Sequence, residues 1–109
     1  MSFEVHTIRP FERQLKRLVK AYPSLRQEYA LLIRSLEEQP DQGTPLGAGC
    51  YKVRVSIASK GKGKSGGARV ITHLAVRERR VWLLSIYDKS EVDSVPLAYV
   101  KALLGHIPP

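Results

Sequence analysis

Positive charge is concentrated between Cys50 and Val70, where six cations occur without a single acidic residue. The six are Lys52, Arg54, Lys60, Lys62, Lys64 and Arg69. Glycines between the lysines let the backbone approach a phosphate chain closely, and the lysines supply mobile point charges. Because neutralised phosphates release their counterions, the segment predicts a salt-sensitive RNA-binding surface at Lys60, Lys62 and Lys64. The alternative is a solvated hairpin loop that is charged only for solubility.

Side chains that suit RNA cleavage flank this loop. Lys52 and Arg54 share one face of an expected strand, opposite its apolar stripe. Arg69 begins the next strand, and Tyr87 and Lys89 lie at the end of the third, so these positions can converge at one end of an antiparallel sheet. RNA cleavage without a metal needs an activated 2'-hydroxyl, cations on the phosphorane and a proton for the leaving 5'-oxygen. A lysine crowded by other cations has a lowered pKa and can act as the base.

The residues alone leave phosphate binding without catalysis equally open. Among the histidines, His6 and His106 are interpreted as structural or solvated, and His73 can border the site because it shares a strand face with Arg69. Cys50 has no second cysteine with which to form a zinc or redox pair. We therefore expect neither a metal site nor a small-molecule cofactor.

Composition narrows the class of protein. The chain has 109 residues, 43% of them hydrophobic, which predicts one domain over residues 1–109 with a real core. A net charge of +8 favours a polyanionic partner. No apolar run approaches the roughly 20 residues of a membrane span, and no secretory signal is visible, so no membrane partner is expected. The single cysteine fits a reducing cytoplasm.

The elements that must position these residues follow from periodicity. Apolar residues at helical spacing predict two helices broken at Pro23, and Ser24 is the expected N-cap of the second. Alternating residues predict strands after the loop-rich middle, and the last strand is apolar on both faces, which places it inside the sheet. The predicted order is a strand at 3–8, helices at 11–22 and 24–36, a linker at 40–49, strands at 51–57, 68–76 and 81–87, and a helix at 94–104. This is an α+β fold in which a strand, a two-helix hairpin, three antiparallel strands and a short helix follow one another, with the helices on one face.

Three stretches are distinctive in combination: residues 51–54, the glycine-lysine loop at 59–71, and residues 84–91, which end in Tyr87-Asp88-Lys89-Ser90-Glu91. Together with the helix break at 22–25, they resemble the RelE/ParE superfamily of toxins, most closely its RelE/HigB-type branch. The resemblance runs over nearly the whole chain and implies a RelE-like fold. It also implies the toxin of a type II toxin–antitoxin pair, an mRNA interferase that cuts mRNA in the ribosomal A site. Its partners would be a cognate antitoxin, mRNA and the ribosome.

The resemblance implies a role for each cation of the site. Lys52 and Arg54 match the strand pair that contacts and activates the attacking 2'-hydroxyl. Arg69 matches the arginine that stabilises charge on the scissile phosphate. Lys89 falls where RelE proper has an arginine near the leaving group.

The tyrosine of RelE proper has no counterpart at the matching position, which falls near residues 95–96 in this chain. Of the two tyrosines that can substitute, Tyr87 is favoured over Tyr99 because it lies beside Lys89. Two other functions stay open: a ParE-like toxin that poisons DNA gyrase by protein contact, and a non-catalytic RNA-binding module. ParE-type toxins usually lack the lysine-rich loop.

Overall fold

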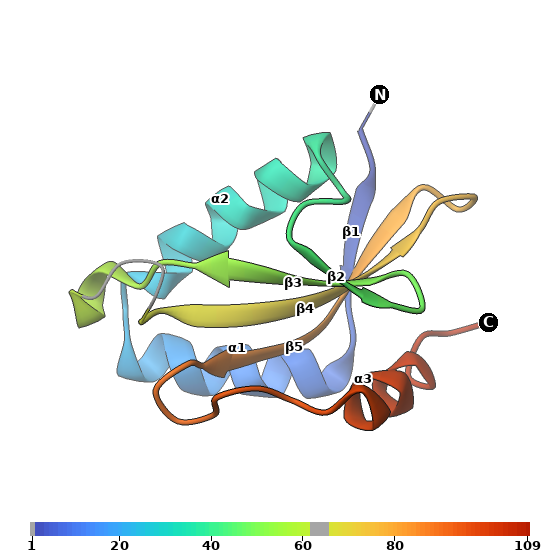
Figure 1. Cartoon of the computed structure of the whole chain (residues 1–109). Coiled ribbons are helices and arrows are strands. Elements are labelled where there is room, and N and C mark those ends of the chain that lie inside the picture. Colours follow the sequence, from blue (N-terminus) through green and yellow to red (C-terminus); the bar gives the residue numbers. More distant parts are fainter. Residues whose placement is uncertain (1, 62–65) are drawn as a thin grey trace.

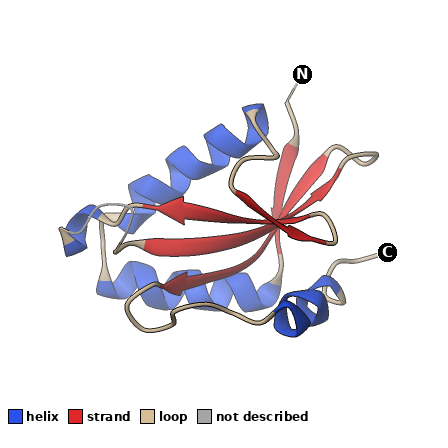
Figure 2. Cartoon of the chain, in the orientation of Figure 1, coloured by secondary structure: helices blue, strands red, loops and turns tan. Residues whose placement is uncertain are grey.

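The computed structural model describes residues 2–61 and 66–109, so the predicted RNA-binding residues Lys62 and Lys64 lie outside the described residues. Five strands and three α-helices occur in the described part (Figures 1 and 2). In chain order they are β1 (Glu4–Thr7), α1 (Arg9–Ala21), α2 (Leu25–Glu38), β2 (Thr44–Gly47), β3 (Cys50–Val55), β4 (Ala68–Ala75), β5 (Arg80–Asp88) and α3 (Leu97–Leu104). The predicted α+β class is confirmed.

The five strands form one sheet in the order β1-β5-β4-β3-β2. β1 runs parallel to β5, and the other neighbouring pairs are antiparallel. β5, the strand that is apolar on both faces, lies between β1 and β4, as its sequence predicted. The antiparallel arrangement brings the start of β4 beside the end of β5, which is the end of the sheet where the candidate residues are expected.

The prediction of a linker over residues 40–49 is wrong for its second half. Thr44–Gly47 is the edge strand β2, paired with β3. Proline is tolerated at a sheet edge, so Pro45 does not prevent this pairing. Gly43 has φ 102°, and a Cβ there would lie 2.5 Å from the carbonyl oxygen of Lys52. Only glycine allows the chain to turn against β3 in this way.

α1 and α2 form the predicted hairpin and lie together behind the sheet in Figure 1. Their inward faces carry fully buried side chains, among them Phe11 and Leu18 on α1 and Leu25 and Leu36 on α2. These helices cover one face of the sheet and complete the core. No helix in the described residues is long and apolar enough to cross a lipid bilayer.

Ser24 occupies the N-cap position of α2, as predicted, but its side chain makes no capping hydrogen bond. Instead, the amide of Ser59 donates to the Ser24 hydroxyl (2.9 Å), and the amide of Ser24 donates to the Ser59 hydroxyl (3.0 Å). Ser59 belongs to a single 3-10 turn, Ala58–Lys60, that follows β3. The serine pair therefore ties the bend of the helical hairpin to the start of the lysine loop.

α3 begins at Leu97 rather than at the predicted Ser94. Pro96 occupies the N-cap position with an extended backbone, and the residue before a proline is disfavoured in the helical region. In Figure 1, α3 lies on the near side of the sheet, away from the α1–α2 hairpin. The prediction that the helices share one face therefore holds for α1 and α2 only.

Candidate active site

Three of the predicted catalytic residues form a row across neighbouring strands. Arg54 on β3 is the register partner of Arg69 on β4, and Arg69 is in turn the partner of Tyr87 on β5. We call Arg54, Arg69 and Tyr87 the cross-strand row. Lys52 lies two residues from Arg54 and therefore on the same face. The structure thus brings four of the five predicted catalytic residues onto one face, opposite the face that carries buried Val70.

The two arginines of the row differ in exposure. Arg54 is exposed, whereas Arg69 is only 4% exposed and donates to the Ala68 carbonyl at 3.1 Å. Like charges directly opposite each other on paired strands are destabilising, and an anion bound between them would relieve this repulsion. A phosphate would meet Arg54 first, and it would reach Arg69 only after a local rearrangement of the site.

Lys89, the fifth predicted residue, is held at the same end of the sheet. Its amide donates to the carbonyl of Gly67, just before β4, at 3.0 Å. A Cβ at Gly67 would lie 2.1 Å from the carbonyl oxygen of Val55, so only glycine lets the start of β4 approach β3 this closely. This close approach aligns Arg69 with its partners and brings Lys89 near the row.

Asp93 also belongs to this site, although the sequence did not single it out. The Lys89 ammonium donates to the Asp93 carboxylate and, at 2.9 Å, to the Asp93 carbonyl. The hydrogen bond and charge of Lys89 lower the pKa of Asp93, and the charge of Lys52 adds to this effect. Asp93 therefore lies near two of the predicted catalytic cations.

Tyr87 is 6% exposed, and its hydroxyl has no hydrogen-bond partner among the described residues. Burial raises the pKa of this hydroxyl, the charge of Arg69 opposes the rise, and the charge of Asp93 adds to it. At neutral pH the group is a proton donor. In the chemistry expected of the site, Tyr87 therefore suits the delivery of a proton or a hydrogen bond rather than proton abstraction.

Lys60 is not part of this face. Its ammonium donates to the Asp88 carboxylate at 2.5 Å and to the Ser90 hydroxyl at 3.0 Å. The Lys60 side chain is 7% exposed and that of Asp88 1% exposed, so this is a buried ion pair. Tyr22, the residue after α1, completes the cluster: its hydroxyl donates to Asp88 at 3.0 Å, and its ring lies 5.2 Å from the Lys60 ammonium. The structure thus buries the Lys60 ammonium between the end of β5 and Tyr22, whereas the sequence predicted a cation that faces phosphate.

Asp88 is the centre of this cluster. Burial alone would raise its pKa, but the hydrogen bonds from Lys60, Ser90 and Tyr22 outweigh burial and lower the pKa to about 2. Ser90 contributes both its amide (3.0 Å) and its hydroxyl (2.8 Å). The cluster therefore fastens the end of β5 to the end of α1 and to the first turn of the lysine loop.

Sequence reasoning named neither Asp88 nor Tyr22 as a site residue and placed Tyr22 in the core. One signal was available for Asp88, which ends a strand that is apolar on both faces and therefore expected to be buried. An acidic side chain is rarely buried unless a cation or hydrogen-bond donor pairs with it. The identity of its partner depends on tertiary packing, which no local pattern reports.

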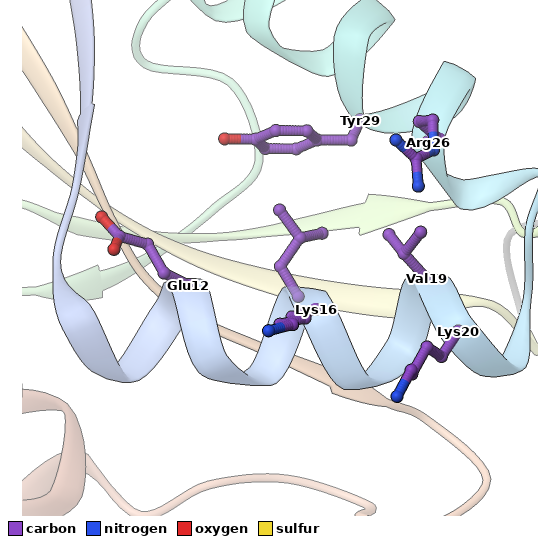
Figure 3. Close-up of a pocket in the computed structure, with 7 residues that line it drawn as sticks. Glu12, Lys16, Val19, Lys20, Arg26 and Tyr29 are labelled. Atoms are coloured by element: carbon purple, nitrogen blue, oxygen red, sulfur yellow. The ribbon is translucent and has the colours of Figure 1, made fainter.

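Outside this end of the sheet, a cavity of about 550 Å³ lies between α1 and α2 (Figure 3). Leu15, Val19 and Tyr29 line it together with Lys16, Lys20, Arg26 and Glu12. None of these is a predicted site residue.

His73 faces Cys50 (Nδ1 to Sγ, 3.7 Å) rather than the cross-strand row. Within the described residues, no group of three His, Cys, Asp or Glu side chains could hold a metal ion.

No protein-family model matches the sequence. Two solved structures of the E. coli toxin RelE are similar to the chain over nearly its whole length. A double arginine-to-alanine mutant in the free state gives a TM-score of 0.62 at 16% identity, covering 98% of this chain and 100% of that one. The crystal structure of the isolated E. coli RelE toxin gives 0.58 at 16% identity, covering 97% and 100%. The chain therefore has the fold of the RelE toxin, as its sequence motifs implied.

Proposed function

We propose that residues 1–109 are one RelE-like domain that acts as the toxin of a type II toxin–antitoxin pair in the cytoplasm. In this proposal the protein is an endoribonuclease that cuts mRNA in the ribosomal A site. The observation that carries it is the cross-strand row, with Lys52 and Lys89 beside it, at one end of a RelE-like sheet. A site in which cations and a tyrosine gather suits phosphoryl chemistry on RNA.

The proposed reaction is a transesterification within the RNA. The ribose 2'-oxygen bonds to phosphorus, the bond from phosphorus to the 5'-oxygen breaks, and a 2',3'-cyclic phosphate and a free 5'-hydroxyl result. Lys52 and Arg54 contact and activate the 2'-hydroxyl, whose proton leaves to a base in the site. Arg69 stabilises the charge of the phosphorane, and Lys89 and Tyr87 stand at the leaving oxygen, which takes up a proton.

The proposed protein partner is a cognate antitoxin with an acidic segment, because a net charge of +8 favours association with an acidic chain. The cavity between α1 and α2 offers such a segment apolar side chains and an excess of positive charge, since three cations and one carboxylate, Glu12, line it. Co-expression with the product of a neighbouring gene should yield a complex, and Lys16→Glu with Lys20→Glu should weaken it. A toxin that stays free and active beside that product would contradict this partner.

Pulse labelling after expression of the chain alone tests the class of activity. We expect protein synthesis to stop while DNA synthesis continues at first, and primer extension to reveal cuts in translated messages. Early loss of DNA synthesis with intact translation would indicate gyrase poisoning instead. Translation arrest without cut messages would indicate a non-catalytic RNA-binding protein.

A further inference from the structure

The last residues of β5 have a strand on one side only. β1 pairs with β5 from Arg80 to Leu83, whereas β4 follows β5 as far as Asp88. Among the described strands, none therefore lies beside residues 84–88 on the side of β1. A sheet edge of this kind leaves backbone N–H and C=O groups without partners in a ladder. Tyr87 of the cross-strand row lies in this half-paired stretch.

The same stretch contains a bulge. Two adjacent residues of β4 pair with Ser85 and Leu83 of β5, which leaves Leu84 without a register partner. A bulge bends its strand and changes the direction of the side chains that follow it. Because side chains alternate between the two faces of a sheet, a slip by one residue would turn Tyr87 to the opposite face. The alignment of Tyr87 with Arg69 therefore depends on what fixes β5 just after the bulge.

The side chain of Gln14, on α1, takes the place of a strand partner directly after the bulge. Its Oε1 accepts hydrogen bonds from the Ser85 hydroxyl (3.1 Å) and from the Ile86 amide (3.0 Å). The Gln14 oxygen thus satisfies the Ile86 N–H as a carbonyl of a neighbouring strand would. Its Nε2 donates to the Tyr99 hydroxyl of α3 at 3.3 Å. Gln14 therefore joins α1 and α3 to the residue that precedes Tyr87.

We propose that Gln14 is a positioning residue that sets the register of β5 after the bulge and thereby holds Tyr87 opposite Arg69. The cluster around Asp88 fastens the strand on the other side of Tyr87, so Tyr87 lies between two anchors. The consequence for catalysis rests on the proposed function. Three cations of the site lie on β3 and β4, which Gln14 does not contact, so loss of Gln14 should slow the chemical step without weakening RNA binding.

The first measurement reads the register without any cleavage. Nuclear Overhauser contacts between Tyr87 and Arg69 report their alignment, and hydrogen exchange of the Ile86 amide reports its bond to Gln14. Gln14→Leu should weaken these contacts and speed exchange at Ile86 by about tenfold or more, whereas the bonded Leu74 amide at the other end of β4 should not change. Gln14→Glu should resemble the wild type, because at neutral pH a carboxylate accepts the same two hydrogen bonds. Unchanged contacts in Gln14→Leu would overturn the inference whether or not the protein cuts RNA; Gln14→Asn, which is one methylene shorter, serves this comparison if Gln14→Leu does not fold.

The second measurement follows the cleavage of ribosome-bound message at steady state. Gln14→Leu should lower kcat about tenfold or more and leave KM within about twofold, because a displaced Tyr87 disturbs the transition state rather than the binding of RNA. Gln14→Glu and Tyr99→Phe should both stay close to the wild type in kcat, since each keeps the bonds to β5 and loses only the one to α3. Equal losses of kcat in Gln14→Leu and Gln14→Glu, or a raised KM at unchanged kcat, would overturn the positioning role and leave the nuclease intact. A wild type that cuts no message would remove the proposed nuclease, and the contacts between Tyr87 and Arg69 would still decide whether Gln14 sets the register.

Discussion

Lys60→Met is expected to cost stability rather than RNA affinity, because the Lys60 ammonium neutralises the buried carboxylate of Asp88. Removing one partner of a buried ion pair typically costs about 3–5 kcal/mol, since the other charge is left without compensation. A pKa of Asp88 that is lowered from 3.8 to about 2 corresponds to roughly 2 kcal/mol of folding free energy at neutral pH. Together these bound the expected loss in unfolding free energy at pH 7 at about 2–5 kcal/mol.

Urea denaturation followed by the fluorescence of Trp82, the one tryptophan, measures this loss. Lys16→Met is the matched control, because Lys16 is exposed on α1, and it should change the unfolding free energy by less than about 0.5 kcal/mol. Adding Asp88→Asn to Lys60→Met should recover most of the loss, because no charge then stays buried.

The pH dependence checks the same ion pair independently. The pKa of Asp88 is depressed in the folded state, so its stabilising contribution is complete above its ordinary value of 3.8 and disappears as the pH falls to about 2. In Lys60→Met, Asp88 is buried without its cation, which favours its protonated form. The loss in unfolding free energy relative to wild type should therefore become smaller as the pH falls from about 4 to about 2. A deficit that stays constant from pH 4 to pH 2, or one no larger than that of Lys16→Met, would refute the buried pair.

Three further outcomes concern RNA. Arg69→Ala should lower the cleavage rate of ribosome-bound message by about a hundredfold or more while changing RNA affinity only a few-fold, because one cation aimed at the transition state matters more than one among many in binding. Lys62→Ala combined with Lys64→Ala should flatten the dependence of log affinity on log salt by about 1.4, at about 0.7 for each phosphate that is no longer neutralised, whereas Lys60→Met should leave the slope unchanged. Fluorescence anisotropy with labelled RNA at several salt concentrations separates these two cases. Asp93→Asn should raise RNA affinity by about two- to fivefold in the same assay, because it releases an ammonium that an exposed ion pair holds only weakly.

The cross-strand row was accessible to sequence reasoning because it depends on two regular features. Alternation along β3 places Lys52 and Arg54 on one face, and antiparallel pairing brings Arg69 and Tyr87 beside them. Both rules act at the level of single strands and their neighbours. The sequence therefore predicted which end of the sheet carries the cations.

The role of Lys60 was not accessible in this way. In the sequence it is one of three lysines alternating with glycines, and its partner Asp88 lies 28 residues further along. Only the packing of the α1 end against the β5 end, through Tyr22, creates the buried site that holds Lys60. β2 was missed for a related reason: its strand character comes from pairing with β3 and not from alternation of its own residues.

The central claim is that the RNA's own 2'-hydroxyl attacks the phosphate held by the cross-strand row. Its most direct test is the cleavage of ribosome-bound message that carries a single 2'-deoxy nucleotide at the cut site, compared with the all-ribose message. We expect the deoxy message to bind with unchanged affinity and stay whole, and the all-ribose message to yield a 2',3'-cyclic phosphate and a 5'-hydroxyl. Cleavage of the deoxy message at the same position would contradict this mechanism.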